Sequence, residues 1–120
     1  MIDPVAPVIN AKYGNLTSAD DKTVVMTVGD TLKTVVQKEI IIKCSATGHP
    51  RPKTTWYRDG LALASGGRYT LNASMIIIKS SQPSDTGKYI CKASNLAGID
   101  EVASFMDVIG RCEAIVQTFF

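Results

Sequence analysis

The sequence contains a single histidine, His49, and this scarcity weighs against most forms of side-chain catalysis. Any Cys-His or Ser-His-Asp arrangement would have to use that residue. His49 lies between Gly48 and Pro50, in a stretch that predicts a loop, and nothing around it resembles a nucleophile site. We therefore expect His49 to be an ordinary exposed loop residue and the protein not to be an enzyme.

Close pairs of metal-ligating residues are also missing. The three cysteines lie at positions 44, 91 and 112, too far apart in sequence for the C-x2-C pairs of a structural zinc site. Asp20-Asp21 and Asp100-Glu101 are adjacent carboxylates, but the spacing of a calcium-binding loop is absent. We expect these acidic pairs to be solvated surface, and we expect no metal and no cofactor.

Long apolar runs and concentrated charge are absent as well. The longest apolar runs, such as residues 40–42 and 75–78, are far too short to span a bilayer, and the first residues do not form a signal sequence. The net charge is +2 with basic residues spread along the chain, so we expect neither membrane insertion nor a nucleic-acid partner. A loose cluster of Arg51, Lys53 and Arg58 leaves contact with a polyanion such as a glycosaminoglycan open.

What the sequence does contain is a series of short β-prone segments separated by turn residues. The strongest covers residues 39–46, where alternation directs Ile40, Ile42 and Cys44 to the same side. Further strands are expected at residues 23–28, 32–36, 54–58, 68–71, 74–79, 88–94 and 100–109, with a possible short edge strand at 5–9. No helical period is visible, so we predict an all-β sandwich.

The order and spacing of several motifs resemble the immunoglobulin-like domain family, in particular its I-set (intermediate set) branch. The resemblance covers roughly residues 24–109. It is carried by Cys44, the loop at 48–52, the run Trp56-Tyr57-Arg58-Asp59-Gly60, the run Asp85-Thr86-Gly87-Lys88-Tyr89-Ile90-Cys91, and Ala93-Ser94-Asn95 before Gly98. It implies an immunoglobulin-like β-sandwich of two antiparallel sheets with Greek-key connections and one inter-sheet disulfide, Cys44–Cys91.

The resemblance also implies folding roles for single residues. Trp56 is expected to pack on the disulfide within a structural core that includes Ile42, Ile78 and Tyr89. The Tyr89 hydroxyl is expected to bind a backbone group between residues 82 and 85, the contact known as a tyrosine corner. None of these roles identifies a binding partner.

Two further roles follow from the same resemblance. Arg68 and Asp85 are expected to form a salt bridge across one end of the sandwich. Gly87 is expected to hold a backbone angle that residues with side chains resist.

Three features depart from the family pattern. The stretch from Gly29 to Cys44 is longer than usual, which leaves the A and A′ strands unassigned. Ser81 stands where the family usually has a small apolar residue. The tail at 111–120, apolar from Ala114 onward, runs past the usual end of the domain. We therefore expect an N-terminal lead-in at 1–22, an I-set domain at 23–110 and a C-terminal tail at 111–120.

Two sequons and an odd cysteine bear on compartment and assembly. Asn15-Leu16-Thr17 and Asn72-Ala73-Ser74 both fit N-x-S/T, which makes Asn15 and Asn72 candidate glycosylation sites. Together with the implied disulfide they favour an extracellular location, either secreted or in the ectodomain of a cell-surface protein. Cys112 is interpreted as a free thiol, as an intermolecular disulfide that makes a homodimer, or as a residue paired within the domain.

These features predict a non-catalytic extracellular module of a larger receptor, adhesion or matrix protein. Its partner would be another protein, bound homophilically or heterophilically. Alternation turns Tyr57, Tyr69 and Phe105 outward, where aromatic side chains can anchor a partner. The alternatives are a structural spacer in a tandem array, including an intracellular muscle-type array, and an accessory domain of an extracellular enzyme.

Overall fold

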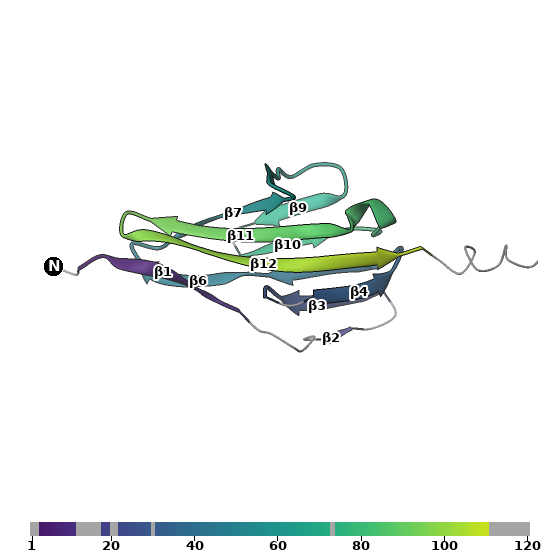
Figure 1. Ribbon diagram of the computed structural model, residues 1–120, viewed down its shortest axis with the longest axis horizontal. Coiled ribbons are helices and arrows are strands. Elements are labelled where there is room, and N and C mark those ends of the chain that lie inside the picture. The colour runs from purple at the N-terminus through teal and green to yellow at the C-terminus, as the bar shows by residue number, and fades with distance from the viewer. Residues whose placement is uncertain (1–2, 12–17, 20–21, 30, 73, 111–120) are drawn as a thin grey trace, which may run out of the picture.

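The computed structural model describes residues 3–11, 18–19, 22–29, 31–72 and 74–110. Within that part of the chain the secondary structure consists of twelve strands and one short 3-10 helix (Figure 1). The strands are β1 (Val5–Asn10), β2 (Ser18–Ala19), β3 (Thr23–Thr27), β4 (Thr31–Val35), β5 (Glu39–Lys43), β6 (Ser45–His49), β7 (Lys53–Arg58), β8 (Leu61–Ala62), β9 (Tyr69–Asn72), β10 (Met75–Ile78), β11 (Gly87–Asn95) and β12 (Gly98–Ile109), and the helix is η1 (Pro83–Asp85). The described residues contain no helix long and apolar enough to cross a membrane.

The strands form two layers. The first sheet has the order β2-β3-β5-β10-β9 and the second sheet the order β4-β12-β11-β7-β8, while β1 and β6 form a separate pair. The disulfide between Cys44 and Cys91 joins the two layers, with a Cα–Cα distance of 6.6 Å. The predicted all-β sandwich with one inter-sheet disulfide is therefore confirmed. Most strand pairs are antiparallel, and the exceptions are the parallel pairs β3–β5 and β4–β12.

The core lies between the two sheets and follows the alternation of the strands. Residues that point inward on β5 and β10 are fully buried, and they meet Trp56, Tyr89 and the disulfide from the second sheet. The buried side chains include Val24, Met26, Val28, Leu32, Ile40, Ile42, Cys44, Trp56, Ile76, Ile78, Tyr89, Cys91, Met106 and Val108. Burying a large apolar side chain contributes about 1.5–3 kcal/mol, so this cluster is the main source of stability.

Strands β5 and β6 follow each other in the first layer and are separated only at Cys44. Two N-terminal strands pair with them, one with each part. β1 pairs antiparallel with β6, whereas β3 pairs parallel with β5. β4 crosses to the second sheet and pairs parallel with β12. Strands β2 and β3 lie between β1 and β4 and add to the first sheet, whereas the long stretch between Gly29 and Cys44 contains β4 and β5. β1 and β4 take the places that the resemblance left open for the A and A′ strands.

The expected edge strand near the N-terminus is present as β1, within the range predicted as a lead-in. Ile9 of β1 is buried in the core, because alternation turns it toward the sandwich. The division into a lead-in at 1–22, a domain at 23–110 and a tail at 111–120 stays a prediction, and residues 111–120 lie outside the described part of the chain.

Candidate protein-contact face

The outer side of the second sheet carries an apolar surface with charged residues of both signs around it. Trp56, Tyr89 and Cys91 point into the core, so their neighbours on β7 and β11 point outward. We call this surface the contact face; it consists of the outward side chains of Tyr57, Lys88, Ile90, Lys92, Ala103 and Phe105. Strand register brings these residues together even though β7 and β12 are far apart in the sequence.

Ile90 forms the middle of the contact face. It lies opposite Tyr57 of β7 on one side and opposite Ala103 of β12 on the other. Lys88 lies opposite Phe105, whose side chain is 50% exposed and is the largest exposed aromatic group on this sheet. Directly opposed residues on one face are close enough for their side chains to interact. The face therefore has a continuous apolar centre across three strands.

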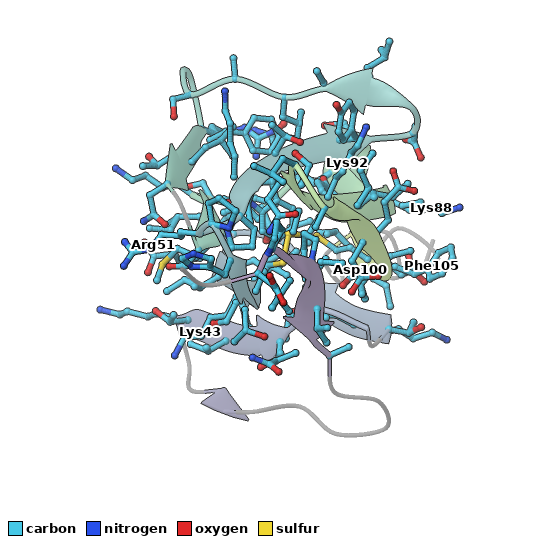
Figure 2. All side chains as sticks on the ribbon, turned by 90° about the vertical axis from the view of Figure 1, so that its left-hand side faces the viewer. Lys43, Arg51, Lys88, Lys92, Asp100 and Phe105 are labelled. Atoms are coloured by element: carbon cyan, nitrogen blue, oxygen red, sulfur yellow. A yellow bond between two sulfur atoms is a disulfide. The ribbon has the colours of Figure 1, made fainter. Side chains whose placement is uncertain are left out.

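Two lysines lie over the aromatic rings of the contact face. The Lys88 Nζ is 6.0 Å from the centre of the Phe105 ring, and the Lys92 Nζ is 5.9 Å from the centre of the Tyr57 ring. At this distance a cation is attracted to the ring face. The end-on view in Figure 2 places Lys88, Lys92 and Phe105 on the same side of the molecule. Tyr57 and Phe105 thus face outward beside the two lysines, and Glu101 of β12 lies opposite Lys92 on the same face.

Tyr69 does not join them, and the expectation that it faces outward is wrong. Its ring packs against the core, because Tyr69 and Leu71 are the inward pair on β9. The Tyr69 hydroxyl accepts a hydrogen bond from Arg58 Nη1 at 3.1 Å and donates one to Asp85 Oδ1 at 3.2 Å. The long side chain reaches the polar end of the sandwich, so its burial leaves no hydroxyl unsatisfied.

Asp85 is the centre of that polar end. Its side chain is 0% exposed, and it accepts two hydrogen bonds from Arg68, at 2.6 Å and 2.8 Å. It also accepts the Gln82 backbone N–H at 2.8 Å. Burial alone would raise the pKa of the Asp85 carboxyl, but the hydrogen bonds from Arg68 and Gln82 outweigh it and hold that pKa below its ordinary value of 3.8. The implied salt bridge is present, and the carboxylate is kept charged.

The tyrosine corner completes the same end of the sandwich. The Tyr89 hydroxyl donates to the Asp85 carbonyl oxygen at 2.6 Å, the type of contact that the resemblance implied. Burial raises the pKa of this hydroxyl, so it stays a donor. Arg58 lies over the Tyr89 ring at 5.7 Å and donates to the backbone carbonyls of Ser84 and Thr86. These contacts hold η1 against the second sheet.

The loose basic cluster of Arg51, Lys53 and Arg58 does not come together in the structure, because Arg58 is used in these contacts. Arg58 is occupied at the η1 end of β7, whereas Lys53 begins the same strand and Arg51 precedes it. Five residues of extended strand separate Lys53 from Arg58, which corresponds to about 16 Å. The structure therefore does not bring Arg58 together with Arg51 and Lys53.

Gly87 is required for a reason other than the expected one. Positive φ angles among the described glycines occur at positions 29, 60, 66 and 67, and Gly87 does not share them. A Cβ at position 87 would lie 2.8 Å from Asp59 Oδ2, which is closer than real Cβ contacts. Asp59 is held there because its Oδ1 accepts the Lys88 N–H at 3.1 Å. Close approach, not backbone angle, excludes a side chain.

Ser81 is a polar residue where the family usually has a small apolar one, and a hydrogen bond satisfies its buried hydroxyl. It is fully buried, and its Oγ accepts the Lys38 backbone N–H at 3.1 Å. A buried hydroxyl is tolerated when it is hydrogen-bonded. The small polar residue thus ties the segment before β5 to the segment before η1.

The remaining predicted positions are exposed or lie outside the described residues. Asn72 is exposed at the end of β9, and its Oδ1 accepts the N–H groups of Ser74 and Met75, both at 3.0 Å. Asn15 and Cys112 lie outside the described residues. His49 is exposed, and no group of three or more metal-ligating side chains comes together in the described part of the chain.

Comparison with known proteins gives consistent matches over this framework. The family model of the immunoglobulin I-set domain matches residues 22–108. Hemicentin-1 of Mus musculus is 44% identical over 71 residues, which is 58% of this chain and 1% of that protein. The cell adhesion molecule DSCAM of Rattus norvegicus is 34% identical over 73 residues, 61% of this chain and 4% of that protein. The chain thus spans only a few per cent of the length of these relatives.

A solved structure supports the fold over a longer range. Titin domain M7 superposes with a TM-score of 0.69, covering 91% of this chain and 99% of that domain at 22% identity. The likeness includes the two-layer architecture but, at this level of identity, says nothing about binding.

Proposed function

The chain belongs to the immunoglobulin I-set family, and from that membership we propose that it is a non-catalytic module that recognises another protein. The observation that carries the proposal is the contact face, where the half-exposed Phe105 of β12 and Tyr57 of β7 lie on either side of β11 and its outward Ile90. Aromatic residues are the commonest energetic anchors of protein interfaces because they bury a large area with few rotatable bonds. Lys88, which lies opposite Phe105, favours a partner with an acidic group beside the apolar centre, whereas Lys92 already lies opposite Glu101.

We further propose that the module is extracellular, as part of a cell-surface receptor, adhesion or matrix protein. A Cys44–Cys91 disulfide persists in oxidising compartments and is rare in the cytosol. The exposed Asn72 keeps its Oδ1 in two backbone hydrogen bonds, which directs the amide nitrogen away from the strand. The nitrogen is the atom that a glycan is attached to. The relative DSCAM is named as a cell adhesion molecule, which agrees with this location.

The contact face is tested by removing its two aromatic groups. The double variant Tyr57→Ala and Phe105→Ala is expected to weaken binding by about 30-fold, equivalent to about 2 kcal/mol, because anchors at the centre of an interface dominate its energy. The measurement is binding of the Fc-fused chain to an array of cell-surface ectodomains, including the chain itself. The matched control is Thr47→Ala with Thr70→Ala, two exposed positions on β6 and β9 of the other layer. Equal binding by all three proteins would contradict the proposal.

Self-association is resolved separately by sedimentation over a range of concentrations, with and without reductant. A dimer that persists in reductant and is lost in the Tyr57 and Phe105 variant places the homophilic contact on the contact face. A dimer that reductant abolishes belongs to an intermolecular disulfide of Cys112.

Glycosylation at Asn72 tests the proposed location. In a secreting eukaryotic host, Ser74→Ala is expected to remove one glycan mass, whereas Ser74→Thr is expected to retain it, because only the second keeps the N-x-S/T triplet. Both variants preserve the backbone N–H that Asn72 binds, so the fold is the same in each. Intact mass spectrometry reads the result, with Asn15→Gln as the background that removes the other sequon. Identical masses for the two variants and the parent would argue against a glycan at this site.

A spacer in a tandem array is the second candidate. It is favoured by the small share of the relatives that the chain matches, 1% of hemicentin-1 and 4% of DSCAM. A pure spacer would bind nothing in the ectodomain array and would stay monomeric, so the same experiments separate the two functions.

A further inference from the structure

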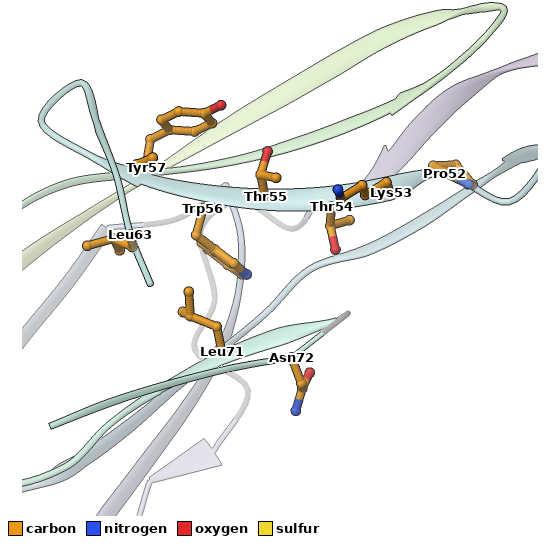
Figure 3. A pocket seen from close by; sticks show the side chains of 10 residues that line it. Pro52, Lys53, Thr54, Thr55, Trp56, Tyr57, Leu63, Leu71 and Asn72 are labelled. Carbon is orange, nitrogen blue, oxygen red and sulfur yellow. The ribbon is translucent and has the colours of Figure 1, made fainter. Parts of the chain in front are cut away.

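An open hollow lies on the flank of the sandwich, between β7 of the second sheet and β9 of the first (Figure 3). Its volume is about 430 Å³, within the usual range for ligand pockets in proteins. Figure 3 shows Trp56 and Leu71 approaching each other across it, with Leu63 at one end. The wall is thus mainly apolar and is supplied by both layers.

The floor of this hollow contains an unsatisfied hydrogen-bond donor. Trp56 is only 2% exposed, and its Nε1 is the buried side-chain donor that has no partner among the described residues. Buried polar groups are nearly always hydrogen-bonded, so a lone indole N–H needs an explanation. In Figure 3 the nitrogen end of the ring points along the hollow toward the side where Thr54 and Asn72 lie. An oxygen atom supplied from outside would satisfy it.

A second hollow continues the first toward the other end of β7. It has a volume of about 270 Å³ and shares Pro52 and Thr54 with the first. Its other lining residues include Arg51, Ser45 and Ser74. We call the two hollows together the flank groove. One end of the groove is apolar with the free indole N–H, and the other end is polar with a guanidinium group.

The polar end carries positive charge that the described residues do not neutralise. Arg51 and Lys53 are exposed, and neither forms a salt bridge within the described ranges. The residues that line the two hollows include no aspartate or glutamate. In the end-on view of Figure 2, Arg51 and Lys43 lie on the opposite side of the molecule from Lys88 and Phe105. The flank groove is therefore separate from the contact face.

We propose that the flank groove binds an extended acidic peptide. One large apolar side chain of the peptide packs between Leu63 and Leu71, and a shift of the Trp56 ring toward the hollow lets a peptide carbonyl accept the indole N–H, which is buried in the free chain. Carboxylates of the same peptide pair with Arg51 and Lys53. This site goes beyond the contact face and does not depend on it. Asn72 and Ser74 line the groove, so a glycan at Asn72 would lie beside the peptide, and the test therefore uses the chain without a glycan.

The spacing within the peptide follows from the strand. Lys53 and Trp56 are three residues apart on β7, about 10 Å in extended backbone, with Lys53 on the outer face of the strand and Trp56 on the inner face. Strand β8 pairs with β7 only at Tyr57 and Arg58, so a peptide that follows the edge of β7 before those residues can contact side chains of both faces. A peptide that runs alongside therefore needs its first acidic residue about three positions from its apolar anchor. A glycosaminoglycan would also pair with Arg51 and Lys53, but it has no apolar group for the hollow. The apolar wall favours the peptide.

The single tryptophan of the chain gives a direct readout. The probe is the peptide acetyl-Leu-Ser-Thr-Glu-Glu-amide, titrated into the ¹⁵N-labelled full chain with the indole N–H signal observed by NMR. We expect the indole signal to move downfield as its hydrogen bond forms. The matched peptides replace the leucine with serine or both glutamates with lysines, and each is expected to bind at least fivefold more weakly. A heparin hexasaccharide is the fourth ligand.

A charge reversal on the protein completes the test. Arg51→Glu is expected to weaken binding of the acidic peptide about fivefold to tenfold, because an attraction becomes a repulsion. Lys79→Glu, the same reversal at an exposed position outside the groove, is expected to leave it unchanged. An indole signal that stays in place up to millimolar acidic peptide would overturn the proposal. So would equal binding of the lysine peptide, or a response at Arg51 and Lys53 to the hexasaccharide alone, which would identify a polyanion site instead.

Discussion

Removing the disulfide with the double substitution Cys44→Ala and Cys91→Ala is expected to lower the free energy of unfolding by about 4 kcal/mol. The bond joins positions that are 47 residues apart, so it restricts a long loop of the unfolded chain. Both cysteines are also fully buried beside Trp56, and their sulfur atoms fill space between the sheets. The total stability of a domain is about 5–15 kcal/mol, so this loss is a large fraction of it.

Urea unfolding followed by tryptophan fluorescence measures that loss. Cys112→Ser serves as the background for every protein, since a third thiol could otherwise exchange with the pair. Reduction of the parent chain should reproduce most of the loss without any substitution. A change below about 1 kcal/mol in both experiments would show that the crosslink contributes little to the stability of the fold.

Replacing Asp85 with asparagine is expected to cost about 3 kcal/mol at neutral pH. Asparagine keeps the shape of the side chain but places an amide N–H₂ where Arg68 now donates two hydrogen bonds. The site is fully buried on the Asp85 side, so the lost charge-assisted bonds are only partly replaced by water. Glu101→Gln, the same chemical change at an exposed position on β12, is the control and should change stability by less than about 0.5 kcal/mol.

The pH dependence of the same pair checks the role of charge. The folded-state pKa of Asp85 lies below its ordinary value of 3.8, so its contribution is fully present above that value and is lost as the pH falls through the folded pKa. The stability difference between the parent and Asp85→Asn should therefore be constant near neutral pH and shrink in acid below about pH 4. Urea titrations at several pH values measure it. A difference that is independent of pH would mean that packing, not ionisation, is lost in the variant.

Much of the core could be predicted because local sequence patterns determine it. Alternation alone placed Ile40 and Ile42 on the same side as Cys44, and the spacing of cysteines and tryptophan matched a known family. Tyr89 and Asp85 lie four residues apart, so their contact is almost local. Where the outcome depends on contacts between distant segments, prediction was weaker. The crowding of Gly87 comes from Asp59, 28 positions away, and no local signal reports it.

The same distinction applies to the two binding surfaces. Outward alternation predicted Tyr57 and Phe105, but the lysines over their rings follow from the register of β7, β11 and β12. The prediction that Tyr69 faces outward was wrong because β9 is a short edge strand, and four positions do not identify its inward residues. The flank groove depends on the separation of β7 from β9 and on an indole N–H without a partner. Neither feature can be predicted from the sequence, because both depend on how distant segments pack.

The contacts between β1 and the β11–β12 hairpin have a consequence for the timing of synthesis. The Ile9 N–H donates to Asp100 and the Asn95 amide donates to the Val5 carbonyl, each at 2.8 Å across at least 90 positions of sequence. β4 likewise has its partner in β12, the last described strand. At about 5–20 residues per second, a ribosome takes several seconds to travel from β4 to β12. The first strands therefore have no partner on that side until late in synthesis, and a chain stopped before residue 95 would lack the contacts of β1 with Asn95 and Asp100 and the pairing of β4 with β12.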